Sequence, residues 1–173
     1  MFKKLLVLVF FIVFQFSFSQ DKSDVFDIAR AGTVEEVKEI LKSNPKAFQV
    51  VNKEGFSPLI LACYKGNNNV AKILIENGSD LNVSSTMGTA LMAAVVKGND
   101  EIVKILLDKN ADINATDSNG TTALMYAVQF QNEYLIKLLL EYKADKSKID
   151  KYGKTAFEFA VFSKNEIIIN LLK

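Results

Sequence analysis

The chain has 173 residues, of which 49% are hydrophobic, and a formal net charge of +1 at pH 7. A near-neutral chain gives no electrostatic reason to expect binding to nucleic acid or to an anionic membrane. The sequence contains no histidine and one cysteine, Cys63. This composition excludes an intramolecular disulfide and the common histidine-dependent catalytic and metal sites. We therefore expect no enzymatic activity, no cofactor, no metal and no small-molecule ligand.

The N-terminus has the pattern of a secretory signal peptide. Lys3 and Lys4 come before an apolar run from Leu5 to Phe14, and the small residues Ser17 and Ser19 follow. This pattern predicts a signal peptide over residues 1–19, with cleavage near Ser19 and an exported location, periplasmic or secreted. The alternative is a membrane anchor, although the apolar stretch is shorter than the roughly 20 residues that cross a bilayer. Cleavage removes two lysines and changes the formal charge from +1 to −1.

After this segment, one helical pattern recurs five times. An alanine returns after 33, 32, 33 and 33 residues, and each copy has a large apolar residue three positions earlier. An α-helix places residues three apart on the same face, so each unit begins with a short amphipathic helix. The alanines are Ala29, Ala62, Ala94, Ala127 and Ala160. A period of this size is typical of helical repeat arrays.

A second helix follows in each unit. Five apolar residues recur at the same spacing: Val37, Val70, Ile102, Leu135 and Ile168. Each of them is followed by two more apolar residues, three and four positions later. The turns before these helices contain Gly66-Asn67 and Gly98-Asn99 in two units, but Gln131 and Lys164 replace glycine in the last two. Because these side chains adopt a left-handed conformation less readily than glycine, we expect the last two units to be looser.

A third signature comes before the first helix of three units. It reads Asn-Lys-Glu-Gly-Phe-Ser-Pro-Leu at 52–59, Asp-Ser-Asn-Gly-Thr-Thr-Ala-Leu at 117–124 and Asp-Lys-Tyr-Gly-Lys-Thr-Ala-Phe at 150–157. With these motifs the chain resembles the ankyrin repeat family. The resemblance implies an all-α solenoid of stacked helix-turn-helix units with β-turn fingers, about five repeats including caps. One domain over residues 20–173 would comprise units at approximately 22–51 (N-terminal cap), 52–83, 84–116, 117–149 and 150–173 (C-terminal cap).

The chain departs from the family pattern in two ways. The histidine that follows the family leucine is replaced by Ile60, Met92, Met125 and Glu158. That histidine normally links neighbouring turns, so we expect coupling between units to depend more on packing. The segment from Asn82 to Leu91 is also one residue shorter than its counterpart in the next unit. We expect its loop tip to differ in shape.

The remaining chemically active side chains favour structural roles. Asp80, Asp112 and Asp145 recur at one position of successive units, which indicates a connection between helix and turn rather than a catalytic pair. Cys63 directly follows the packing alanine Ala62, so we interpret it as a small buried side chain; the alternative is a reactive thiol.

The resemblance implies a protein-binding groove on the concave surface of the array. The positions that point into it, carried over by register, are Phe56, Tyr64, Lys65, Val96, Lys97, Asn119, Gln129, Phe130, Tyr152, Lys154 and Phe162. Aromatic residues are frequent among them, and a central exposed aromatic contributes roughly 2 kcal/mol to an interface. The alternative is that Phe130 and Phe162 fill gaps between small neighbouring side chains.

These observations predict a non-catalytic, exported module that docks on or regulates one or more proteins. The resemblance implies an accessory factor for an enzyme, for example in oxidative stress defence. The alternative is an inhibitor or immunity protein that neutralises a toxin enzyme. We expect a monomer, with no membrane contact beyond the signal peptide. The last helix, over 165–173, is apolar on more than one face, which favours contact with a partner or a second copy.

Overall fold

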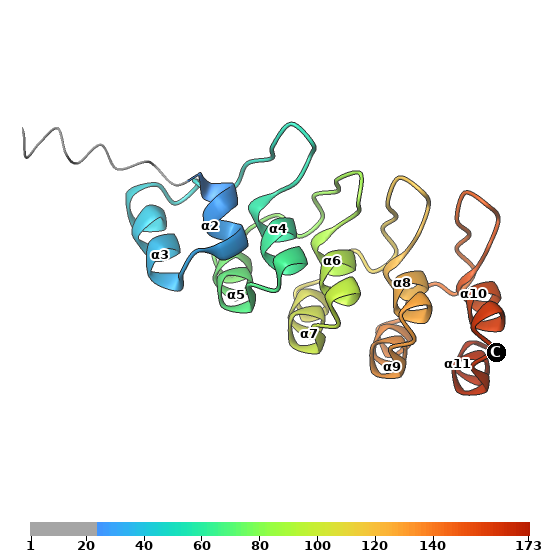
Figure 1. Cartoon of the computed structure of the whole chain (residues 1–173). Helices are drawn as coiled ribbons and strands as arrows, with labels where there is room; N and C mark the ends of the chain where they lie inside the picture. Colours follow the sequence, from blue (N-terminus) through green and yellow to red (C-terminus); the bar gives the residue numbers. More distant parts are fainter. Residues whose placement is uncertain (1–23) are drawn as a thin grey trace, which may run out of the picture.

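The computed structural model describes residues 24–173, and the predicted signal peptide at 1–19 lies outside that range. Within it the chain forms helices arranged as five successive pairs, with no strand beyond an isolated bridge between Ser85 and Gly88. Figure 1 shows the pairs side by side in a row. The pairs are α2 (Val25–Ala31) with α3 (Val34–Ser43), α4 (Pro58–Lys65) with α5 (Asn68–Glu76), α6 (Ala90–Lys97) with α7 (Asp100–Asp108), α8 (Ala123–Gln129) with α9 (Glu133–Glu141), and α10 (Ala156–Ser163) with α11 (Glu166–Leu172). The predicted all-α solenoid is confirmed.

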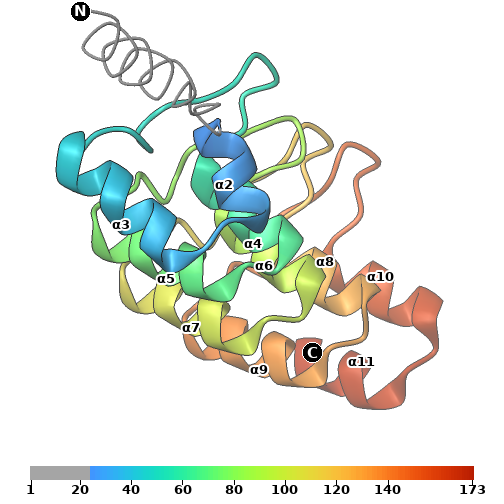
Figure 2. The same ribbon diagram turned by 60° about the vertical axis from the view of Figure 1, so that its left-hand side comes forward.

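The helices form two layers, and the fingers project from one of them. The first helices of the pairs, α2, α4, α6, α8 and α10, lie next to the fingers, whereas the second helices form the other layer (Figures 1 and 2). Each first helix packs against the first helices of its neighbours. The five repeating alanines are all 0% exposed. Because a methyl group lets adjacent helices approach closely, this alanine sets the spacing of the stack.

Asp24 caps the start of α2 and a serine or threonine caps the other first helices, and a left-handed residue lies at or just after the end of four of them. Thr122, for example, accepts a hydrogen bond from the backbone N–H of Met125. At the C-terminal end, Gly66 and Gly98 are left-handed. Gln131 and Lys164 adopt the same conformation, with φ of 52° and 54°. The expectation that the last two units are looser stays a prediction.

The fingers are shaped by one side chain near the start of each. Asn52, Asp117 and Asp150 each accept hydrogen bonds from the backbone N–H groups two and four residues later. In the shorter unit Ser85 takes this place, and its backbone exchanges two hydrogen bonds with Gly88. The predicted difference in shape of this tip is confirmed. It follows directly from the missing residue.

Asparagine side chains link neighbouring units. The Asn82 side-chain oxygen accepts a hydrogen bond of 2.8 Å from the Asp112 N–H, and Asn114 accepts one of the same length from Asp145. The Asn67 amide donates to the Gly32 carbonyl at 2.9 Å. Coupling between units therefore does not depend on packing alone, because asparagine supplies polar links where the family histidine is absent. Asp112 also accepts from the Asn114 N–H, in agreement with its predicted structural role.

Candidate protein-binding surface

A pocket of about 360 Å³ lies where the last two fingers meet their first helices. Its lining comes from the fingers around 119–121 and 150–154 and from α8 and α10. Four predicted site residues line it: Asn119, Gln129, Tyr152 and Lys154. The structure therefore brings together side chains that are up to 35 residues apart in the sequence. A concave site with aromatic walls and a few polar groups is typical of a recognition pocket.

The structure separates exposed from packed aromatic residues among the predicted positions. Tyr64 is 42% exposed, Phe130 57%, Phe162 68% and Tyr152 72%. The interpretation of Phe130 and Phe162 as gap fillers is therefore wrong, because a gap-filling ring would be buried. Phe56, in contrast, is half-buried and packs against the core. Phe56 is thus mainly a packing residue and not the freely exposed ring that its register implied.

Lysine ammonium groups accompany several of these rings. Lys154 Nζ lies 4.3 Å from the ring centroid of Phe162, and Lys151 Nζ lies 5.1 Å from that of Tyr152. Lys65 Nζ is 5.8 Å from the ring of Tyr64. Such cation–π contacts hold the long side chains against the aromatic surface. The predicted lysine Lys97 is exposed and Val96 is half-buried, both at the end of α6.

Charge is distributed unequally between the two helix layers. Taken together, the second helices α3, α5, α7, α9 and α11 carry more acidic than basic side chains. The late first helices and finger tips instead carry mainly lysines, with Glu54 as an acidic neighbour: Lys53, Lys65, Lys97, Lys151 and Lys154. The finger tips and the ends of the first helices are therefore more basic than the second-helix layer.

Sequence reasoning missed three residues that line the pocket, Tyr126, Asp150 and Phe159, and Asp117, which holds Tyr126 in place. The hydroxyl of Tyr126 donates to Asp117 Oδ2 at 2.7 Å. Burial, together with this hydrogen bond, raises the pKa of Tyr126 to about 12. A spacing of nine residues separates Asp117 from Tyr126 and Asp150 from Phe159. That repeated spacing is a signal in the sequence, but it does not show which side chains meet.

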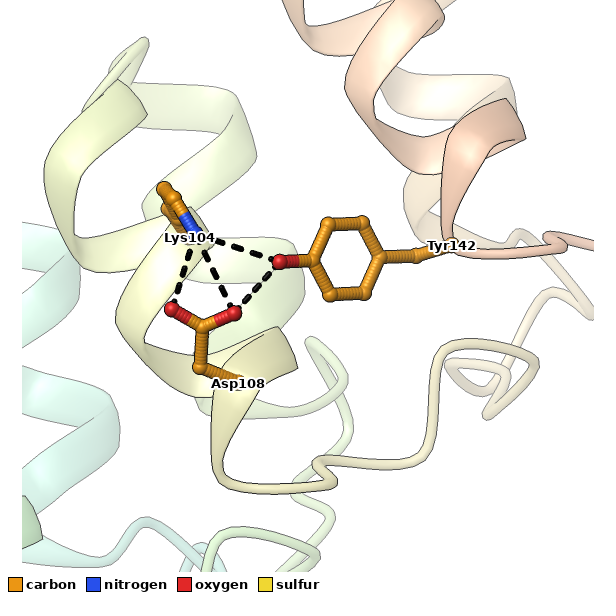
Figure 3. Close-up of polar contacts among 3 residues, drawn as sticks. All are labelled: Lys104, Asp108 and Tyr142. Atoms are coloured by element: carbon orange, nitrogen blue, oxygen red, sulfur yellow. Dashed lines mark hydrogen bonds and ion pairs between the residues drawn. The ribbon is translucent and has the colours of Figure 1, made fainter.

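A polar cluster on the second-helix layer joins α7 to the residue after α9 (Figure 3). Lys104 Nζ donates to Asp108 Oδ2 at 2.9 Å and to the Tyr142 hydroxyl at 3.2 Å, and that hydroxyl donates to Asp108. Hydrogen bonds from Tyr142 and Lys104 lower the pKa of Asp108, and the bond to Asp108 raises the pKa of Lys104 to about 12. These contacts link two neighbouring units on the face away from the fingers.

The remaining nucleophile candidate is buried. Cys63 is 1% exposed in α4, and desolvation raises the pKa of its thiol to about 12. The alternative of a reactive thiol is therefore wrong for the folded protein. Within residues 24–173, histidine, cysteine, aspartate and glutamate nowhere gather in threes that could hold a metal ion. No helix in this range has both the length and the hydrophobicity needed to span a membrane.

Comparison with known proteins agrees with this architecture. The family model for ankyrin repeats, in three copies, matches residues 25–117 and 111–173. A curated relative, ankyrin repeat and SAM domain-containing protein 6 from Rattus norvegicus, is 35% identical over 73 residues. That match covers 41% of this chain and 8% of the relative, so the chain spans only a small part of the rat protein. The chain belongs to the ankyrin repeat family, and its repeats form a protein–protein interaction module.

Proposed function

We propose that this protein is a non-catalytic docking module that binds and regulates another protein through its concave surface. The observation that carries this proposal is the exposure of four aromatic side chains at the ends of first helices and on a finger: Tyr64, Phe130, Tyr152 and Phe162. Rigid aromatic rings bury a large area at a low cost in conformational entropy, and they are enriched among the residues that dominate interfaces. The accompanying lysines supply charge complementarity at the rim.

The chemistry of the side chains supports a binding role over catalysis. The sequence has no histidine, and the thiol of Cys63 is buried with a pKa of about 12. Asp117 and Asp150 use carboxylate oxygens to hold the finger backbones. A nucleophile has to be accessible and ionised near neutral pH, which the buried thiol of Cys63 is not, and both aspartates already hold the finger backbone.

The proposed setting is an exported compartment, periplasmic or secreted, with the protein acting as a monomer. The basic and apolar pattern of residues 1–19 supports export. Within that compartment we favour the role of an accessory factor for an enzyme, for example in oxidative stress defence. An inhibitor of a toxin enzyme is the second candidate, because the same exposed aromatic surface would serve tight inhibition.

The test is crosslinking and capture of partners from the exported fraction with three forms of the protein. They are the parent, a groove variant with Tyr64, Phe130, Tyr152 and Phe162 changed to alanine, and the control Tyr134→Ala. Tyr134 is 53% exposed but lies on α9, in the second-helix layer. We expect one protein to be captured by the parent and the control and lost from the groove variant, with equal helix content by circular dichroism.

Equal capture by all three forms would contradict the proposed surface. Loss of capture only in an additional fourth form, Ile167→Ala, would move the interface to α11, where Ile167 is 55% exposed. If the captured protein is an enzyme, its activity with and without the purified protein separates the two roles. Complete inhibition at equal concentrations supports an inhibitor, whereas retained or increased activity supports an accessory factor.

A further inference from the structure

Asp150 has one carboxylate oxygen that no group of the described chain satisfies. Its Oδ1 accepts hydrogen bonds from the backbone N–H groups of Tyr152 at 2.8 Å and Lys154 at 2.9 Å. Within residues 24–173 no donor reaches Oδ2, although Asp150 is only 7% exposed. In that range every fully buried side-chain oxygen has a hydrogen-bond partner, so Oδ2 has to be accessible. Asp150 lines the pocket between the last two fingers, so its free acceptor lies beside this pocket.

The preceding unit shows what kind of group fits this acceptor. Asp117 holds its finger in the same way with Oδ1, and its Oδ2 accepts the hydroxyl of Tyr126, nine residues later. The residue nine positions after Asp150 is Phe159, which has no hydroxyl. At this position, therefore, the last unit lacks the phenolic donor of the preceding one. When a ligand displaces the water around a buried carboxylate, a hydrogen bond from a donor of that ligand stabilises the complex considerably.

The walls and rim of the pocket narrow the choice of occupant. Tyr126, Tyr152 and Phe159 supply aromatic walls, against which an inserted ring can pack edge to face or offset. Lys151 and Lys154 line the same pocket, so two ammonium groups lie beside the carboxylate of Asp150. A cationic donor such as arginine or lysine would be repelled by these two ammonium groups, whereas a neutral hydroxyl would not. Carboxylates beside the inserted group would pair with the two lysines.

We propose that this pocket receives a tyrosine side chain from an acidic segment of the partner protein. The phenol donates its hydrogen bond to Asp150 Oδ2, the ring packs against the aromatic walls, and flanking aspartate or glutamate residues pair with Lys151 and Lys154. This inference rests on the proposed function, and it names the chemistry of the partner segment.

The experiment selects random peptides displayed on phage against the purified protein, with elution by soluble protein. The enriched sequences are then synthesised, and their affinities are measured by fluorescence anisotropy. We expect a tyrosine flanked by acidic residues to dominate the enriched sequences. Replacing that tyrosine by phenylalanine in the peptide should weaken binding at least about tenfold, since a hydrogen bond to a charged acceptor is lost.

Two protein variants provide the matched controls. Phe159→Tyr places a hydroxyl where it can donate to Asp150 internally, as Tyr126 does to Asp117. This change should lower the affinity for the tyrosine peptide but not for its phenylalanine analogue. Lys151→Gln with Lys154→Gln should remove the preference for acidic flanks and the salt dependence of binding. If Phe159→Tyr loses helix content, the comparison of the two peptides on the parent protein still decides the question.

The outcomes distinguish this inference from the proposed function. Enriched peptides that bind the groove without a tyrosine and acidic flanks, or that contain arginine at the anchor position, would overturn the inference and leave the binding function intact. Equal affinities of the tyrosine and phenylalanine peptides would also overturn it. If no peptide is enriched and no partner is captured by the concave surface, both proposals fail.

Discussion

The hydroxyl of Tyr126 donates to Asp117 Oδ2 at 2.7 Å and ties the middle of α8 to the start of its own finger. Asp117 also accepts from the backbone N–H groups of Asn119 and Thr121. One buried carboxylate therefore fixes both the curvature of the finger and its position over the helix. Because the neighbouring pocket lies between this finger and the next one, the bond helps to define the shape of the candidate binding site.

Removing this hydroxyl should lower the free energy of unfolding and change how that free energy depends on pH in the alkaline range. Tyr126→Phe should lower the free energy of unfolding by about 1–2 kcal/mol, because a hydrogen bond to a carboxylate is lost. The pKa of Tyr126 is about 12 in the folded protein, against about 10 in an unfolded chain. Its contribution is therefore present below pH 10 and lost as the pH rises towards 12. Urea denaturation between pH 7 and 11 measures both effects.

The matched control for this change is Tyr134→Phe, since Tyr134 is exposed on α9 and its hydroxyl has no partner among residues 24–173. We expect that variant to unfold like the parent at every pH. If the free energy of unfolding of Tyr126→Phe falls with alkaline pH just as that of the parent does, the assigned role of this hydrogen bond is contradicted.

Two glycines with the same backbone conformation allow a steric test of finger packing. Gly120 and Gly78 both have φ of +76°. A Cβ at Gly120 would lie 3.2 Å from Asp150 Cα and from the Lys151 nitrogen, whereas a Cβ at Gly78 would meet nothing within 4 Å. Gly78→Ala should cost about 1–2 kcal/mol for the left-handed conformation alone. Gly120→Ala should cost clearly more, because the next finger has to move.

Thermal and urea unfolding of the two variants measure that difference. In addition, Gly120→Ala should weaken capture of the partner, while Gly78→Ala should not. Equal destabilisation by the two changes would show that the fingers separate without cost.

The left-handed lysine at the end of α10 offers a stabilising change. Lys164 has φ of 54°, and its side chain is exposed without a hydrogen bond within the described residues. Lys164→Gly should raise the free energy of unfolding by roughly 0.5–1 kcal/mol, because glycine adopts this conformation without steric strain. Lys137→Gly, in the middle of α9, is the opposite control and should lower it by about 1 kcal/mol. Destabilisation by both changes would exclude strain at Lys164.

The cluster on the second-helix layer should affect stability in acid. Hydrogen bonds from Tyr142 and Lys104 hold the pKa of Asp108 below its ordinary value. This carboxylate therefore stabilises the fold above about pH 4, and the contribution is lost as the pH falls further. Asp108→Asn should reduce the melting temperature slightly at pH 7 and low salt, with the difference from the parent vanishing near pH 2.

Glu141→Gln serves as a control on an exposed carboxylate of α9 that forms no ion pair within 24–173. Its melting temperature should follow that of the parent in acid. A difference between Asp108→Asn and the parent that persists at pH 2 would mean that the carboxylate charge is not the cause.

The sequence predicted the fold well because every unit repeats the same local signals. The alanine at 29, 62, 94, 127 and 160 marks the first helices, and all five are buried as their spacing required. The site was harder to predict, since burial depends on neighbours that the register does not specify. Phe56 and Tyr152 both lie in finger segments, yet Phe56 packs on the core and Tyr152 is 72% exposed.

The role of Asp150 could not be read from its motif either. Its finger signature resembles that of Asp117, and only the three-dimensional pairing of Asp117 with Tyr126 shows that Phe159 leaves an acceptor free. Likewise, the links from Asn82 and Asn114 to the following unit connect residues about 30 positions apart. Spacing within a single unit carries no information on such bonds.

The burial of Cys63 has a consequence for the chemistry of the whole chain in an oxidising environment. Its thiol is 1% exposed in α4, which packs between α2 and α6. Two intact molecules therefore cannot become covalently crosslinked through it, and oxidants reach the sulfur only after neighbouring units separate. The rate at which a thiol reagent modifies this one position therefore measures how often the stack opens, without an engineered label.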